Sequence, residues 1–204
     1  MEMTENVLAL ICSLKPTPAP SSSALIAEHV FDTMRRHGAQ CEAIRCVDFN
    51  IAPGVEADMG DGDEWPQIRE KVLKADVLLI STPVWLGNPS SVTQRVLERL
   101  DAELSHSDDQ GRPMMAGKVA IVSVVGNEDG AHKCVADIFQ GLNDIGFSIP
   151  AQGCTYWNGA AMESTDYNDL DEVPSAVASA TAAAARNALH LAGVRRQSAY
   201  PPYE

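Results

Sequence analysis

The chain has 204 residues, of which 45% are hydrophobic, and its formal net charge at pH 7 is −13. This length predicts one domain with a substantial core, which we place at residues 1–196, followed by a loose tail at 197–204. The excess of acidic residues argues against a nucleic-acid partner and against an anionic membrane surface, because both require a basic face on the protein.

The five cysteines are odd in number, so they cannot all pair in disulfides, and none of them forms a C-x-x-C motif. No Cys or His group has the close spacing of a zinc or iron–sulfur site, so we expect no metal centre. The first residues lack the basic stretch of a signal peptide, and no apolar run approaches the roughly 18 residues of a membrane span. We therefore expect free thiols and a cytoplasmic location.

Short apolar runs alternate along the chain with longer segments of helical spacing. Strands are predicted at 7–11, 41–47, 77–80, 118–125 and 151–156. Helices are predicted at 25–34, 68–75, 90–104, 131–145 and 175–192. The segment 48–63 is rich in glycine and acids, so we expect an exposed loop there.

Five strands that alternate with helices predict an α/β fold, in which helices cover both faces of a parallel sheet. A dinucleotide-binding sheet would carry G-x-G-x-x-G after the first strand. Residues 12–23 instead read C-S-L-K-P-T-P-A-P-S-S-S, a loop rich in proline and hydroxyl groups. We therefore predict a flavodoxin-like, doubly wound, five-stranded parallel sheet with strand order 2-1-3-4-5.

The loop after the first predicted strand carries Ser13 at its start and Ser21, Ser22 and Ser23 at the beginning of a helix. Ligands of such a sheet bind outside the carboxyl ends of the strands. A helix N-terminus stabilises a phosphate there through free N–H groups and a partial positive charge, and hydroxyls add donors. One of these serines is alternatively an ordinary N-cap. Four serines exceed what capping requires, so we predict a phosphate-binding loop.

Aromatic side chains follow two of the predicted strands. The loop 81–91, S-T-P-V-W-L-G-N-P-S-S, comes directly after the third strand, and its amides and Trp85 suit the polar edge and the face of a flat ring. Trp85 is alternatively a plug at the end of the sheet or a subunit contact. Tyr156 and Trp157 form either a further wall of the pocket or a subunit contact. The predicted ring-binding residues are Pro83, Val84, Trp85, Leu86 and Gly87.

The loop after the fourth strand, residues 126–132, reads G-N-E-D-G-A-H. Its glycines allow backbone N–H groups to approach a ring oxygen and to stabilise negative charge on a reduced ring. Glu128 and Asp129 alternatively compensate the helix dipole. His132 is a candidate catalytic proton donor or hydrogen-bond partner, or else a surface histidine. The predicted ligand contacts of this loop are Gly126, Asn127, Glu128, Asp129 and Gly130.

Over nearly its whole length the chain resembles the flavodoxin-like superfamily and, within it, the NAD(P)H-dependent FMN reductases. Residues 82–91 and 126–132 are similar to the second and third flavin loops of that family. The resemblance implies non-covalent FMN, with its phosphate at Ser13 and Ser21 to Ser23 and its ring between the other two loops. The first loop departs from the tight Thr/Ser-x-Thr-Gly-x-Thr pattern of electron-carrier flavodoxins, which favours the reductase branch.

The resemblance implies an FMN-dependent oxidoreductase that takes hydride from NADH or NADPH and reduces a quinone, free flavin or similar small-molecule acceptor. The flavin supplies the redox chemistry, and the protein supplies position and electrostatics. No motif distinguishes NADH from NADPH. A homodimer or homotetramer is also implied. The alternatives are a flavodoxin-type electron-transfer module, whose acidic surface would steer basic partners, and a flavin-binding protein without turnover.

Overall fold

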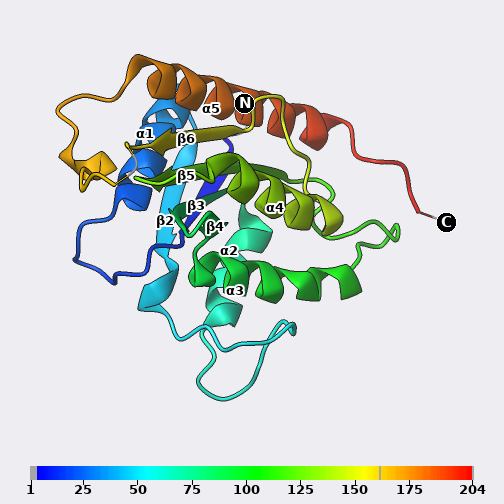
Figure 1. The fold of residues 1–204 in the computed structure, drawn as a ribbon. Helices are drawn as coiled ribbons and strands as arrows, with labels where there is room; N and C mark the ends of the chain where they lie inside the picture. The colour runs from blue at the N-terminus through cyan, green and yellow to red at the C-terminus, as the bar shows by residue number, and fades with distance from the viewer. Residues whose placement is uncertain (1–3, 161, 204) are drawn as a thin grey trace.

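A parallel sheet forms the centre of the computed structural model, which describes residues 4–160 and 162–203. Its parallel strands are β1 (Asn6–Ile11), β2 (Gln40–Arg45), β3 (Val77–Trp85), β5 (Val119–Gly126) and β6 (Cys154–Asn158). They lie in the order β2-β1-β3-β5-β6, and a short β4 (Asn88–Pro89) pairs antiparallel with the end of β3 (Figure 1). Counted over the parallel strands, this is the predicted flavodoxin-like order 2-1-3-4-5.

Helices cover both faces of the sheet. They are α1 (Ser22–Arg36), α2 (Trp65–Lys74), α3 (Ser91–Leu100), α4 (Ala131–Asp144) and α5 (Ser175–Gln197), with 3-10 turns η1 (Cys46–Asp48), η2 (Asp101–Ser105) and η3 (Tyr167–Asp169). In β1, Val7 and Ala9 belong to the core on the face covered by α1 and α5, whereas Leu8 and Leu10 belong to the core on the face covered by α2, α3 and α4. This alternation follows from the two-residue period of a strand, and it explains why strands buried on both faces read as continuous apolar runs.

Several predicted boundaries were wrong. The third strand does not end at residue 80, because β3 continues alongside β5 to Pro83, which pairs with Val125, and its pairing with β4 extends it to Trp85. Cys46 and Val47 form the turn η1 instead of strand. The predicted helix 90–104 is α3 followed by η2, and the fifth predicted strand lies two to three residues later, in β6.

A buried ion pair anchors the long loop that precedes α2. The Arg99 guanidinium donates to both carboxylate oxygens of Asp63, at 2.9 and 2.7 Å, and the two side chains are 0% and 1% exposed. Arg99 also donates to the carbonyls of Ala52 and Glu56. These hydrogen bonds from Arg99 hold the pKa of Asp63 well below its usual range. The Arg99–Asp63 pair therefore fixes the loop predicted at 48–63 to α3, although many residues of this loop are exposed.

The chain after α5 lies against the loop between η2 and β5. The N–H of Tyr203 donates to the carbonyl of Gln110 at 3.0 Å, and Arg112 donates to the carbonyl of Tyr200 at 2.9 Å. The Arg195 guanidinium lies 3.6 Å from the centre of the Tyr200 ring. The described residues of the predicted tail therefore make specific contacts with the rest of the protein.

Among the residues that the structure describes, no helix has both the length and the apolar character to cross a membrane.

Candidate functional site

A cleft of about 160 Å³ lies at the carboxyl ends of β1, β3 and β5. The predicted site residues that line it are Ser13, Ser21, Ser22, Ser23, Pro83, Val84, Trp85, Gly126 and Asn127. The remaining predicted residues, Leu86, Gly87, Glu128, Asp129, Gly130 and His132, are outside its lining. The fold therefore brings parts of all three predicted loops to one cleft.

The first turn of α1 forms one end of the cleft. Ser21 is the N-cap, because its Oγ accepts the N–H of Ala24 at 3.1 Å, and the Ser13 hydroxyl donates to the carbonyl of Lys15. Ser22 and Ser23 occupy the first helical positions, where the N–H groups have no intrahelical acceptor and form the positive end of the helix dipole. The groups that suit an anion here are the Ser22 and Ser23 amides, and Lys15 also lines this cleft.

Hydroxyl groups beneath the cleft hold this helix end on the sheet. The Ser81 hydroxyl of β3 donates to the carbonyl of Ser23 at 2.6 Å and accepts the Ser123 hydroxyl of β5 at 2.8 Å. The Ser81 and Ser123 side chains are fully buried. Because buried polar groups are costly to leave unpaired, this chain of hydroxyls fixes the first turn of α1 relative to β3 and β5.

Two charged residues at the end of β2 hold the proline-rich part of the first loop. Arg45 donates to the carbonyl of Ala19 at 2.7 Å. Asp48 accepts the Thr17 N–H at 2.8 Å and the Thr17 hydroxyl at 2.6 Å. These two residues were not predicted from the sequence. Their positions in the sequence could have indicated this role. β2 lies next to β1, so charged side chains at its carboxyl end can reach the loop that follows β1.

The Asp48 contact predicts a pH-dependent stability. The two hydrogen bonds from Thr17 lower the pKa of Asp48 from its ordinary value of about 3.9. Their contribution is therefore present above that ordinary value and is lost as the pH falls through the lower pKa of the folded protein. Because Asp48 is exposed and solvent weakens its contacts, we expect Asp48→Asn to lower the Tm by only about one to two degrees at pH 7 and the difference from wild type to shrink below about pH 4. Differential scanning calorimetry of both proteins between about pH 3 and pH 7 measures this Tm difference. A Tm difference that does not change with pH would contradict the prediction.

The second and third loops contact each other directly. The Leu86 N–H donates to Glu128 Oε1 at 2.6 Å, so the Leu86 amide, predicted to bind a ring edge, is bonded within the protein. Gly130, at φ +130°, packs against Gly87 so closely that a Cβ atom on Gly130 would lie 2.7 Å from the Gly87 Cα. Trp85 lies at the mouth of the cleft and is 55% exposed. The two loops thus form one joined wall beside an accessible aromatic ring.

Tyr156 and Trp157, predicted to follow the fifth strand, are neighbours within β6, so their side chains point to opposite faces of the sheet. Trp157 lines the cleft on the α1 side. Tyr156 points to the opposite face and meets the His132 ring edge-on, with the ring centroids 5.0 Å apart. The geometry does not bring His132 to the lining of the cleft.

A further wall of the cleft was not predicted from the sequence. It is formed by Asp166, Tyr167 and Asn168 of the long connection between β6 and α5. This connection is polar and irregular, and no motif in it points to the carboxyl ends of distant strands. Tyr167 nevertheless has only 2% of its surface exposed.

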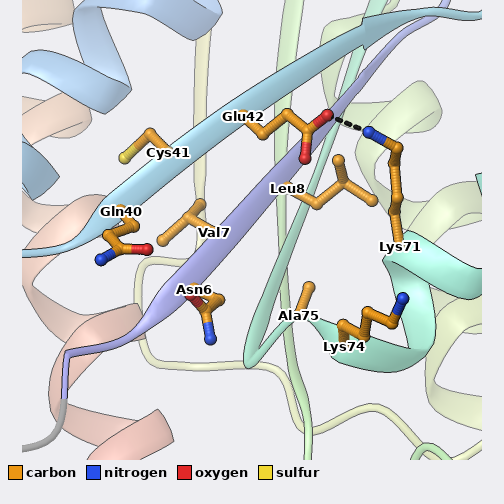
Figure 2. A pocket seen from close by; sticks show the side chains of 9 residues that line it. All are labelled: Asn6, Val7, Leu8, Gln40, Cys41, Glu42, Lys71, Lys74 and Ala75. Carbon is orange, nitrogen blue, oxygen red and sulfur yellow. Dashed lines mark hydrogen bonds and ion pairs between the residues drawn. The ribbon is translucent and has the colours of Figure 1, made fainter.

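A second groove, of about 610 Å³, lies at the amino ends of β1 and β2 beside the end of α2 (Figure 2). It brings together Asn6, Gln40 and the Lys71–Glu42 ion pair, which spans from α2 to β2. It has no aromatic lining among the described residues, and the charge of Lys71 is compensated. Since ligands of doubly wound sheets bind at the carboxyl ends of the strands, we place the candidate site at the smaller cleft.

The family of NADPH-dependent FMN reductases matches residues 6–162. The chain belongs to this family. The match includes all five parallel strands and the three loops that meet at the cleft. Membership supports a flavin-dependent oxidoreductase that uses FMN.

Relatives from two organisms match most of the chain. A Mycobacterium bovis protein named divalent metal cation transporter MntH is 36% identical over 168 residues, which are 80% of this chain and 25% of that protein. The 8-demethyl-8-aminoriboflavin-5'-phosphate synthase of Streptomyces davaonensis is 29% identical over 174 residues, 81% of this chain and 68% of that protein. The chain thus spans a quarter of the first of these relatives and about two thirds of the second.

Solved structures share the fold over nearly the whole chain. RosB with bound 8-demethyl-8-formylriboflavin-5'-phosphate has a TM-score of 0.88 at 26% identity, covering 97% of this chain and 82% of that one. An NADH:FMN oxidoreductase, EMOB, in its apo form has a TM-score of 0.65 at 20% identity, covering 97% of this chain and 92% of that one.

Proposed function

We propose that the protein binds FMN in the cleft, accepts hydride from NADH or NADPH and passes electrons to a quinone, free flavin or similar small acceptor. The observation that carries this proposal is the convergence of a helix N-terminus with an exposed Trp85 and the glycine-containing third loop at one cleft. This set of groups fits FMN, because the amides suit a phosphate and the apolar walls suit a flat ring. The family match supports the same cofactor.

The residues of the chain have separate roles in this proposal. Ser22 and Ser23 bind the phosphate through their amides, and Arg45 and Asp48 hold the loop beside them. Bound FMN supplies the hydride-accepting chemistry. Gly126 and Asn127 of the third loop line the cleft, where their backbone N–H groups would stabilise negative charge on a reduced ring. We assign no proton transfer to His132, because it lies away from this lining.

The assembly and location of the protein also belong to the proposal. We propose a homodimer or homotetramer, as the resemblance implies, and a cytoplasmic location, which the free thiols support. Light scattering of the purified protein measures the oligomeric state. A monomer at micromolar concentration would contradict the proposed oligomer.

Removal of one amide at the start of α1 tests the phosphate contact. Ser22 is the first helical residue and Ser21 before it has extended dihedrals, so Ser22→Pro removes the N–H without disturbing the helix. We expect the Kd for FMN to rise at least about tenfold, because a hydrogen bond to a charged group is lost, and the Kd for riboflavin to change little. Isothermal titration calorimetry measures both values.

Ser22→Ala is the matched control, since it removes the hydroxyl and keeps the amide. It should raise the Kd for FMN less than Ser22→Pro does. If Ser22→Pro weakened FMN and riboflavin equally, the phosphate would not be bound by this amide.

Anaerobic reduction tests the activity. We expect protein reconstituted with FMN and desalted to keep the flavin, and its visible absorbance to bleach within seconds of adding NADPH or NADH. Steady consumption of the nucleotide after addition of a quinone would then show turnover. Bound flavin that neither nucleotide reduces would instead support the electron-transfer module or the flavin-binding protein without turnover.

A second candidate function has FMN as the substrate. The structure is more similar to RosB, at a TM-score of 0.88, than to the NADH:FMN oxidoreductase, at 0.65. The name of the Streptomyces davaonensis relative describes replacement of the flavin 8-methyl group by an amino group. Mass spectrometry of FMN recovered after aerobic incubation distinguishes the two functions, because a reductase returns FMN of unchanged mass, whereas an enzyme of the second kind changes it.

A further inference from the structure

The connection from β6 to α5, residues 159–174, is much longer than the two to six residues usual between a strand and a helix of an α/β domain. It turns back toward the start of α1, where η3 lies (Figure 1, orange). Asp166, Tyr167 and Asn168 line the same cleft as the predicted loops. We call the described residues 159–160 and 162–170 the arch. Long connections of this kind often carry function.

The arch is fastened at both ends of the cleft. Near the third loop, the Gly159 N–H donates to the carbonyl of Gly126 at 2.8 Å, and the Asn127 side-chain amide donates to the carbonyl of Glu163 at 3.0 Å. At α1, the Asn168 N–H approaches Ser22 Oγ at 3.4 Å. The arch therefore spans from the loop proposed to hold the ring to the helix end proposed to hold the phosphate.

Tyr167 is the fixed centre of the arch. Its ring packs against Trp157, with ring centroids 5.7 Å apart, and is buried among Ile26, Val125 and Val177. Its hydroxyl lies 2.8 Å from His29 Nδ1, on α1. A buried hydroxyl without a partner would be costly, so this hydrogen bond favours one position of the ring. Tyr167 therefore lines the cleft in a fixed position, and His29 of α1 holds it there.

We propose that Tyr167 determines which flavins the cleft accepts, and that His29 is the positioning residue that holds it there. The inference rests on the proposed binding of FMN. The Asn168 N–H of η3 lies 3.4 Å from Ser22 Oγ, and η3 lines the cleft beside the proposed phosphate position. A flavin that ends in a monophosphate fits between Ser22 and the arch. A flavin extended beyond its phosphate by a nucleotide would meet η3, where Asn168 is exposed and the buried Tyr167 ring holds the turn in place.

The test compares the Kd values for FMN and FAD in wild type, Tyr167→Ala, Tyr167→Phe and His29→Ala, measured by quenching of flavin fluorescence. We expect wild type to bind FAD at least tenfold more weakly than FMN. Tyr167→Ala should reduce this ratio at least fivefold, and His29→Ala should reduce it less. Tyr167→Phe keeps the ring but loses the same hydrogen bond as His29→Ala, so it should reduce the ratio about as much as His29→Ala does. Tyr200→Ala, a change of a tyrosine in the C-terminal tail, should leave the ratio unchanged.

The outcomes separate this inference from the proposed function. A merely structural role for Tyr167 would weaken both flavins equally and leave their ratio unchanged, which would overturn the inference, as would equal binding of FMN and FAD by wild type. Failure of wild type to bind FMN would instead overturn the proposed function. If circular dichroism shows that Tyr167→Ala is unfolded, the ratio in His29→Ala decides, and an unchanged ratio there would also overturn the inference.

Discussion

Replacement of Arg99 by methionine is expected to cost about 3–5 kcal/mol of folding free energy, because it leaves a buried carboxylate without its cation. Within the described part of the chain, Asp63 would keep its hydrogen bonds from the N–H groups of Ala52, Met59 and Trp65 and no other. The carbonyls of Ala52 and Glu56 would lose the guanidinium as well. Urea unfolding at pH 7, followed by tryptophan fluorescence, measures the loss.

Arg95→Met is the matched control on the same helix. Arg95 donates to one carbonyl, that of Ile51, at 3.1 Å, so its loss should cost about 1 kcal/mol. If both variants lost similar small amounts, the Arg99–Asp63 pair would not be the anchor of the loop that precedes α2.

Substitution of Gly130 by alanine is expected to raise the Kd for FMN at least tenfold. At φ +130° an L side chain is strained by about 1–3 kcal/mol, and its Cβ would also collide with the Gly87 backbone. The second and third loops would have to separate, and the Leu86 to Glu128 hydrogen bond would be disturbed. Isothermal titration calorimetry with FMN measures the effect.

Gly60→Ala controls for backbone strain alone. Gly60 also has positive φ, +96°, but no described atom lies within 4 Å of the position that a Cβ would take, and it belongs to the loop before α2. It should lower the stability and leave the Kd for FMN unchanged. An equal change of the Kd in both variants would mean that the contact between Gly130 and Gly87 does not shape the site.

The strand order and the three loops at the carboxyl edge could be predicted because they depend on local patterns. Apolar runs mark the strands, and the residues that follow them must meet at one edge of a parallel sheet. The length of β3 could not be predicted in this way. Pro83 normally argues against a central strand, but it pairs with Val125, and the Thr82 hydroxyl accepts the Thr93 hydroxyl within the core.

The wall of the cleft formed by Asp166, Tyr167 and Asn168 could not be predicted from the sequence either, nor could the ion pair that anchors the loop before α2. Tyr167 meets His29 across 138 positions of sequence, and Arg99 meets Asp63 across 36. Neither pair leaves a local pattern, because the contact exists only after the helices have packed on the sheet. The N-cap role of Ser21 was one of the two predicted alternatives, and the structure shows it directly.

The most direct test of the account is a crystal structure of the protein with FMN. We predict that the phosphate lies within hydrogen-bond distance of the Ser22 and Ser23 amides, with the ring between Trp85 and the loop 126–132. A phosphate bound elsewhere, for example in the groove at the amino ends of β1 and β2, would contradict the assignment of the cleft.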